Sequence, residues 1–278
     1  MDHTTRLFLE RTYKQYNRRR YVSPDPLQFL YAYEQVRDRE IAALVAGLLA
    51  YGRVRQIVKS VSGVLCLMGC SPAAFLTDTS HTGLRRICAG FRHRFATGSE
   101  LGLLLCAIKN VISSYGSLYG CFRASMGADD TTVIPALKGF VDMLRGSVPG
   151  LDCHLLPCPG KGSACKRLHL FLRWMVRSDD VDPGGWEAIH AGALIVPLDT
   201  HMFRIGSALG FTARKQADVK AALEITRGFK RFSPDDPVKY DFALTRFGIR
   251  DELELHGILS TMHALRKRPG QDAPVAGM

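Results

Sequence analysis

The sequence predicts an all-α fold, and two observations carry this prediction. Apolar residues recur at helical spacing in most segments of the 278-residue chain, for example over residues 38–50 and 53–68. No segment keeps the apolar–polar alternation of a half-buried strand, and no Asn-Gly or Asp-Gly pair marks a tight hairpin. With 46% hydrophobic and 23% charged residues, the composition is that of an ordinary globular protein.

The first half of the chain predicts eight helices. The first, over residues 5–19, ends before Pro24 and Pro26, because a proline ring does not fit a helix interior. The helix over residues 38–50 is nearly all apolar after an acidic first turn with Asp38 and Glu40, so we expect it to be buried. The remaining helices are expected over residues 53–68, 71–76, 82–94, 100–114, 117–125 and 133–144.

The second half begins with a glycine-rich turn and continues with four helices. The turn leads into a helix over residues 163–177. Asp199 is expected to cap the next helix by accepting the backbone N–H of Met202 or Phe203, and Gly210 ends that helix. Helices over residues 216–229 and 235–247 follow, and residues 268–278 are expected to be disordered.

Charge and cysteine usage narrow the classes of function. The net charge of +11 favours a polyanionic partner, and nucleic acid is the commonest one. The chain has no run of 18 apolar residues and no secretory signal, which predicts a cytoplasmic protein without a membrane partner. The eight cysteines include no CxxC pair and lie largely among aliphatic residues, so we expect reduced core thiols and no metal site.

A turn and the helix after it hold the first candidate residues. The backbone N–H groups of the turn Gly160-Lys161-Gly162-Ser163 can point at a phosphate, although a plain helix–helix turn has the same sequence pattern. Lys166 lies in the next helical turn, and Arg173 and Arg177 follow at i+7 and i+11. This basic stripe is either a solvated face or a setting that favours a neutral, nucleophilic Lys166 amine.

Asp199 is the second candidate, 33 residues after Lys166. It opens the helix with Asp199-Thr200-His201 and has two interpretations, a helix cap or a carboxylate that faces a cleft. The two are compatible, because one carboxylate oxygen can cap while the other faces the cleft. His201 is by residue type more often a polar surface residue than a functional one.

Residues 197–204 give these candidates a family context. They are similar to the Val-Asp-Thr-His-hydrophobic-Phe-Arg signature of the endonuclease III branch of the helix-hairpin-helix DNA glycosylases. Residues 41–50 resemble the first barrel helix of that branch, and residues 70–76 resemble the segment after its third. Over nearly its full length the chain is also similar to an uncharacterised bacterial family that resembles this superfamily. That similarity rests on residues 38–40, 48–53, 115–118, 162–168, 172–177, 197–201 and 236–244.

The chain departs from the endonuclease III branch in three ways. The long spacing between Lys166 and Asp199 is more similar to that of the archaeal 8-oxoguanine glycosylase branch, and residues 178–195 would be the inserted segment. Lys161, within the glycine-rich turn, remains an alternative to Lys166 as the nucleophile. No cysteine follows Cys165, so the iron-sulfur loop is missing and no cofactor is expected. Tyr51-Gly52-Arg53 replaces the glutamine that plugs the DNA gap.

The resemblance implies one unit over residues 1–267, in which two helical subdomains flank a basic cleft. A helical barrel over residues 36–177 would carry a helix-hairpin-helix-like motif, and residues 1–35 and 199–267 would form the second lobe. Lys166 and Asp199 would be the catalytic pair, from opposite walls of the cleft. DNA contacts are implied for Gly160, Lys161, Gly162, Ser163, Arg167, Arg173, Arg177, Arg53 and His201.

The function implied is DNA repair by base excision. A monomeric, nucleoid-associated N-glycosylase with AP-lyase activity would flip a damaged base, an oxidised purine by analogy, out of double-stranded DNA. Lys166 would attack the sugar C1′, and Asp199 would stabilise the positive charge that develops on the sugar.

Two other functions fit the same residues. A non-catalytic nucleic-acid-binding protein that keeps the fold would bind in a salt-dependent manner and tolerate Asp199→Asn. An enzyme of another class, with a small phosphorylated substrate on the basic stripe, would bind nucleotides and be indifferent to duplex DNA.

Overall fold

The computed structural model describes residues 3–151, 154–249, 257 and 259–262, and it confirms the all-α class. Helices make up most of these residues, and the sheet within them is a two-stranded antiparallel hairpin of β1 (Arg92–His93) and β2 (Ala96–Thr97). The expected tail over residues 268–278 and the end of the expected second lobe lie outside the described residues.

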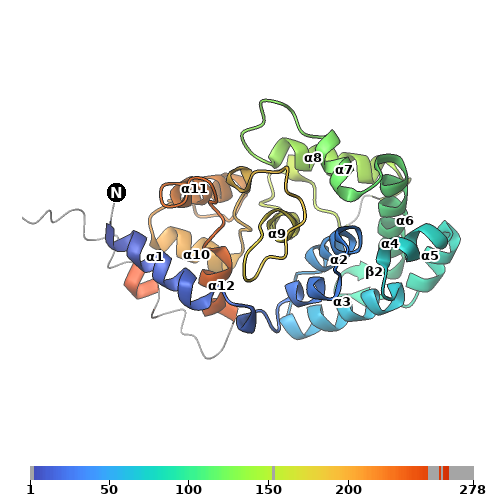
Figure 1. Cartoon of the computed structure of the whole chain (residues 1–278), viewed down its shortest axis with the longest axis horizontal. Helices are drawn as coiled ribbons and strands as arrows, with labels where there is room; N and C mark the ends of the chain where they lie inside the picture. Colours follow the sequence, from blue (N-terminus) through green and yellow to red (C-terminus); the bar gives the residue numbers. More distant parts are fainter. Residues whose placement is uncertain (1–2, 152–153, 250–256, 258, 263–278) are drawn as a thin grey trace, which may run out of the picture.

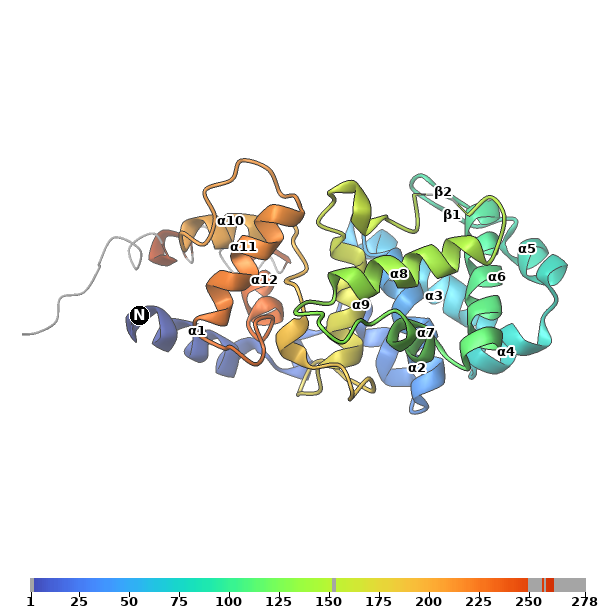
Figure 2. The same ribbon diagram turned by 90° about the horizontal axis from the view of Figure 1, so that it is seen from above.

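One group of helices occupies one end of the molecule (Figures 1 and 2). The 3₁₀ helix η2 (Pro26–Ala32) packs against α2 (Val36–Leu48) and α3 (Val54–Met68), so it lies with this group and not with the second lobe to which residues 1–35 were assigned. The α-helices of the group are α2 (Val36–Leu48), α3 (Val54–Met68), α4 (Pro72–Asp78), α5 (His81–Cys88), α6 (Gly98–Tyr115), α7 (Leu118–Ala124) and α8 (Ile134–Gly146).

A second group lies at the other end and brings residues near the N-terminus together with residues 200–249. It comprises α1 (His3–Tyr16), α10 (Thr200–Ala208), α11 (Val219–Lys230) and α12 (Asp241–Ile249). Helix α12 packs against both α1 and α10, and α10 packs against α11. Helix α9 (Lys166–Val176) lies between the groups and packs extensively against α2 (Figure 1). Short 3₁₀ helices η1 (Arg19–Tyr21), η3 (Pro159–Lys161) and η4 (Ala191–Ala193) complete the described elements.

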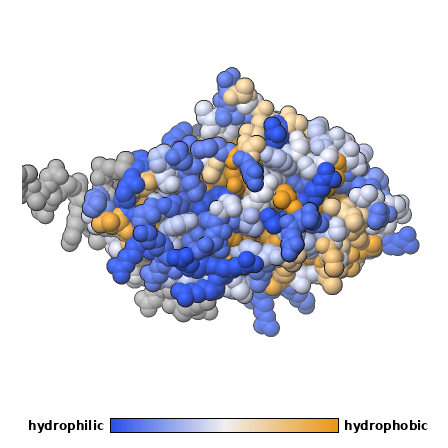
Figure 3. Space-filling view, viewed as in Figure 1, coloured by the Kyte–Doolittle hydropathy of each residue, from blue (hydrophilic) through white to orange (hydrophobic). Residues whose placement is uncertain are grey.

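The surface of the two groups differs in polarity. In the view of Figure 3, strongly hydrophilic residues cover most of the end that holds α1 and α10–α12, whereas hydrophobic residues gather more on the end that holds α3–α6. Among the described residues, no single helix is long and apolar enough to cross a membrane, although two bent pairs, α3–α4 and α6–α7, pass that test when joined.

The prediction of a helix over residues 82–94 is wrong at the C-terminal end of that helix. Helix α5 stops at Cys88, and the chain turns into the β1–β2 hairpin. The extended backbone places His93 in the core, where its ring is hydrogen-bonded to Ser60 Oγ at 2.9 Å and to the carbonyl of Tyr51 at 3.1 Å. Arg94 takes a left-handed φ of 53° at the turn, a conformation that glycine or asparagine more often supplies.

The acidic residues of α2 connect it to its neighbours instead of acting on their own helix. Asp38 caps the first turn of α4. Glu40 accepts hydrogen bonds from Leu118 N at 2.7 Å, Tyr119 N at 3.0 Å and Trp186 Nε1 at 3.0 Å. Burial raises the pKa of Glu40 to about 7 even though these three donors oppose the shift. The carboxylate therefore fixes α7 and the loop around Trp186 against α2.

Gly47 allows α2 to pack closely against α9 and so helps to place Lys166. A Cβ atom at this position would meet the carbonyl oxygen of Arg167 at 3.0 Å and Phe171 Cβ at 3.3 Å. Both neighbours are parts of α9 that move only with the helix, so a larger residue would push the two helices apart.

We expect Gly47→Ala to lower the free energy of unfolding by about 1–3 kcal/mol, as overpacking of a close helix contact does. Gly63→Ala on α3 is the matched control, since a Cβ there meets nothing within 4 Å. That control should raise stability slightly, because alanine has the higher helix propensity. Chemical denaturation of both variants checks the pair, and equal effects would contradict the packing argument.

Candidate functional site

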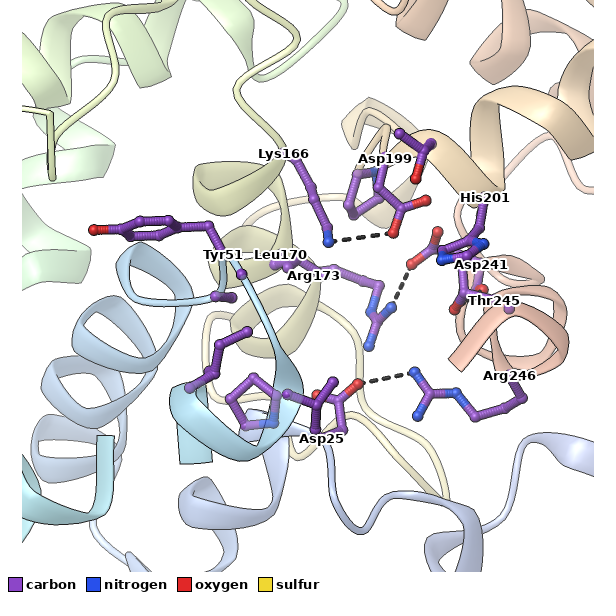
Figure 4. A pocket seen from close by; sticks show the side chains of 18 residues that line it. Asp25, Tyr51, Lys166, Leu170, Arg173, Asp199, His201, Asp241, Thr245 and Arg246 are labelled. Atoms are coloured by element: carbon purple, nitrogen blue, oxygen red, sulfur yellow. Dashed lines mark hydrogen bonds and ion pairs between the residues drawn. The ribbon is translucent and has the colours of Figure 1, made fainter. Parts of the chain in front are cut away.

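A pocket of about 330 Å³ opens between the two groups of helices. Its wall is built from the segment between α2 and α3, from the first turns of α3, from α9, from the start of α10, from α12, and from Asp25 and Pro26 at the start of η2. Residues far apart in the sequence thus converge on one cavity, as Figure 4 shows. The volume is at the lower end of the range for small-ligand sites.

Lys166 and Asp199 meet in this pocket. The Lys166 Nζ lies 3.2 Å from Asp199 Oδ2, and the two side chains are 34% and 14% exposed. The other oxygen, Asp199 Oδ1, accepts the backbone N–H of Met202 at 2.8 Å and so caps α10. The expected cap is therefore present, and the second carboxylate oxygen is paired with Lys166.

The glycine-rich turn lies just before Lys166 and is exposed. Helix α9 begins at Lys166, not at Ser163, because Cys165 at its N-cap takes a left-handed φ of 43°. Gly162 also has a left-handed φ, 78°, and its carbonyl accepts the N–H of Val219 at 3.1 Å. Residues 160–163 are all exposed, so the turn is fixed to the start of α11 with its outer face in solvent.

The predicted basic stripe of Arg173 and Arg177 is wrong. These side chains are 2% and 5% exposed, so neither lies on a solvated face. Arg173 forms ion pairs with Asp182 and Asp241, and Arg177 forms ion pairs with Asp179, Asp182 and Asp236. Helical spacing placed them opposite the apolar face of α9, but the second group of helices covers that side too.

This buried ion network joins α9 to the second group. The segment after α9, which the resemblance treats as an insertion, folds back and supplies Asp179 and Asp182. Tyr13 of α1 donates a hydrogen bond to Asp179 Oδ2 at 3.0 Å, which extends the network to the N-terminal helix. The network therefore holds the wall that carries Asp199 and Asp241 against the wall that carries Lys166.

Three other predicted DNA contacts have different environments. The Arg167 guanidinium donates to the carbonyls of Leu48 and Leu155, at 2.8 and 3.1 Å, and so serves the protein's own backbone. Arg53 is exposed at the N-cap of α3, beside the pocket. His201 is half-buried and lines the pocket.

Asp241 also lines the pocket, although no sequence pattern singled it out. The helix expected over residues 235–247 begins only at Asp241, because turns occupy the preceding residues. Asp241 is 3% exposed, and burial, with a further contribution from Asp199, raises the pKa of Asp241 to about 6 although Arg173 opposes the shift. The sequence feature that could have identified Asp241 is that it is a single acidic residue between Tyr240 and Phe242 in a largely apolar segment.

None of the cysteines that the structure describes lines this pocket. Cys88, Cys106, Cys121 and Cys165 are buried free thiols, as expected, whereas Cys66 and Cys70 are exposed, contrary to that expectation. Within the described residues, no group of three or more His, Cys, Asp or Glu side chains could hold a metal ion.

Comparison with known proteins places the chain in a family. A family model described as "Protein of unknown function (DUF2400)" matches residues 25–250. The chain belongs to this family. No curated protein and no solved structure matches it. The DUF2400 region contains every residue that lines the pocket, from Asp25 to Gly248.

Proposed function

We propose that this protein is a DNA glycosylase with AP-lyase activity that excises a damaged base from double-stranded DNA. The observation that carries the proposal is the Lys166–Asp199 pair, 3.2 Å apart in a pocket between two groups of helices. An amine and a carboxylate side by side suit attack on a sugar carbon, since one supplies the nucleophile and the other stabilises positive charge.

The proposed reaction uses each atom of the pair in turn. Asp199 Oδ2 accepts a proton from the Lys166 ammonium, and the freed electron pair attacks the sugar C1′. The bond from C1′ to the base breaks, and the base leaves with its electrons and takes the proton that Asp199 accepted. The ionised Asp199 carboxylate then stabilises the positive charge on the sugar. The attached nitrogen passes a proton to O4′ as the ring opens, which gives a Schiff base between Lys166 and C1′. Loss of the C2′ proton with departure of the 3′ phosphate cleaves the strand, and water releases the lysine.

The exposed groups around the pocket supply the proposed DNA contacts. Lys161 and the turn over residues 160–163 lie beside the N-terminus of α9, where backbone N–H groups and the helix dipole favour a phosphate. Arg53 flanks the pocket from the other group of helices. Because Arg173 and Arg177 are buried, these exposed groups make the phosphate contacts that were expected from the basic stripe.

An exposed aromatic side chain near the pocket also favours a nucleic-acid ligand. Phe95, at the β1–β2 turn, is 70% exposed, and the Arg94 guanidinium lies 5.5 Å from its ring centroid. Arg94 in turn packs on Gly52 of the pocket wall, where a Cβ would meet its side chain at 2.7 Å. An aromatic ring and an arginine can stack on bases exposed by flipping.

The test is base release from a panel of duplexes, each with one modified base, followed by mass spectrometry of the free base and by gel analysis of strand cleavage. We expect one or more duplexes to lose the modified base and then to be nicked. We also expect duplex affinity to fall steeply with added salt, because the contacts are to phosphates. Salt-dependent binding without release of any base would instead support the non-catalytic nucleic-acid-binding function.

A further inference from the structure

Two polar atoms on the pocket wall lack a partner among the described residues. Asp241 Oδ2 is paired with Arg173, but Asp241 Oδ1 is buried and forms no hydrogen bond. His201 Nδ1 is also buried without a hydrogen-bond partner. Buried polar atoms are nearly always satisfied in native proteins, so two such atoms on the wall of one pocket indicate groups that a ligand completes.

The two atoms lie beside the catalytic pair and are held in place. Figure 4 shows the Asp241 carboxylate on the pocket side of α12, close to His201 and facing Asp199. The His201 ring packs against Gly248 of the same helix, where a Cβ would meet Nδ1 at 2.2 Å. Arg173 fixes the Asp241 carboxylate from α9. A ligand that reaches Lys166 therefore meets a preorganised polar wall.

The chemistry of the two atoms defines the ligand edge that fits them. Burial raises the pKa of Asp241 to about 6, so at pH 7.5 its free oxygen is ionised and can only accept a hydrogen bond. His201 Nδ1 donates in the tautomer that carries its proton there. Asp241 Oδ1 as acceptor and His201 Nδ1 as donor therefore complement a base edge in which a ring N–H lies next to a carbonyl. They do not complement an edge in which an unprotonated ring nitrogen lies next to an amine.

We propose that Asp241 Oδ1 and His201 Nδ1 select lactam-type nucleobases, in which a ring N–H stands next to a carbonyl. Hypoxanthine, guanine, 8-oxoguanine and uracil belong to this class, whereas adenine and cytosine present the opposite pattern. The proposal rests on the proposed function, in which the pocket receives a flipped base, and it names the class of base that the pocket accepts.

A matched set of nucleosides tests the selection on the unaltered protein. 2′-Deoxyinosine and 2′-deoxyadenosine differ only at the edge that the two atoms would contact, and 1-methyl-2′-deoxyinosine lacks the ring N–H. Calorimetric or NMR titration at pH 7.5 should give affinity for deoxyinosine at least about tenfold higher than for the other two. Equal affinity for all three nucleosides, or no binding of any of them in the millimolar range, would overturn the proposal.

A variant locates the selection at Asp241. In Asp241→Asn the amide can donate as well as accept, so the preference for deoxyinosine should fall to within about threefold. Asp236→Asn is the matched control, because Asp236 belongs to the same ion network through Arg177 but does not line the pocket. An unchanged preference in Asp241→Asn, or an equal loss in Asp236→Asn, would overturn the role of Asp241.

Nucleoside binding needs neither duplex DNA nor catalysis, so the two proposals fail separately. Base release without discrimination among nucleosides would reject the lactam selection and leave the glycosylase function intact. Selective nucleoside binding without release of any base would reject the glycosylase function, and the pocket would remain a lactam-selective binding site.

Discussion

Asp199→Asn should reduce the rate of base release on the order of 10²-fold or more, while the protein stays folded and keeps its affinity for DNA. Asparagine is as good an N-cap as aspartate, so the hydrogen bond to Met202 N should persist. The charge that faces Lys166 at 3.2 Å is lost, however, and with it both the proton acceptor and the stabilisation of the sugar cation. Single-turnover kinetics, with the protein in excess over the duplex and at a concentration above the Kd, measure the chemical step.

The chain offers a closely matched control for this variant. Asp218 caps α11 by accepting Ala221 N at 2.8 Å, and it forms an ion pair with Arg214 at 2.7 Å, but it does not line the pocket. Asp218→Asn should therefore leave the rate of base release within a few-fold of the wild type. Comparable rates for Asp199→Asn and the wild-type protein would contradict the catalytic role of Asp199.

Arg177→Ala should lower the free energy of unfolding by about 3–5 kcal/mol, the largest effect on stability that we predict. The Arg177 guanidinium contacts Asp179, Asp182 and Asp236, and Asp182 is fully buried. Removing the cation takes a counter-charge from all three carboxylates and leaves Asp182, which solvent does not reach, paired with Arg173 alone among the described residues. Equilibrium urea denaturation measures the loss.

A surface arginine provides the comparison. Arg18 pairs with Asp180, but both side chains are more than half exposed, at 51% and 56%. Because solvent and salt screen such pairs, Arg18→Ala should change stability by less than about 1 kcal/mol. Similar losses for the two variants would show that burial of the Arg177 network does not determine its contribution.

Local signals singled out Lys166 and Asp199, and the resemblance to the DNA glycosylases implied that the two residues meet. An aspartate before the first helical residues marks a cap, and a lysine after a glycine-rich turn marks the first turn of a helix. Neither signal needs the tertiary structure, although the 3.2 Å contact itself does. Most helices were predictable for the same reason, since helical spacing of apolar residues is a property of one segment.

The buried arginines were not predictable from helical spacing. Arg173 is paired with Asp241, which lies 68 residues further along the sequence, and Arg177 is paired with Asp236, which lies 59 residues further along. A charge opposite the apolar face of one helix is ordinarily solvated, and only the packing of the second group of helices shows that this face is covered. The ion pairs depend on contacts that no single segment contains.

The β1–β2 hairpin and the start of α12 were missed for different reasons: the hairpin turn lacks the usual turn residues, whereas the segment before α12 holds residues that also cap helices. Arg94 holds a left-handed conformation without glycine or asparagine, so no turn signal precedes β2. Before α12, Ser233 and Asp235 are good caps by type, yet the helix starts at Asp241. That later start brings the Asp241 carboxylate to Arg173 and to the pocket.

Borohydride trapping tests the central claim, that the Lys166 amine attacks the sugar C1′, most directly. The protein is incubated with duplexes that carry an abasic site or 8-oxoguanine, in the presence of borohydride, which reduces a Schiff base to a stable amine crosslink. Wild-type protein and Lys161→Gln should form the crosslink, and Lys166→Gln should not. A crosslink that persists in Lys166→Gln and disappears in Lys161→Gln would move the nucleophile to the turn, and the absence of any crosslink in the wild-type protein would contradict lysine attack.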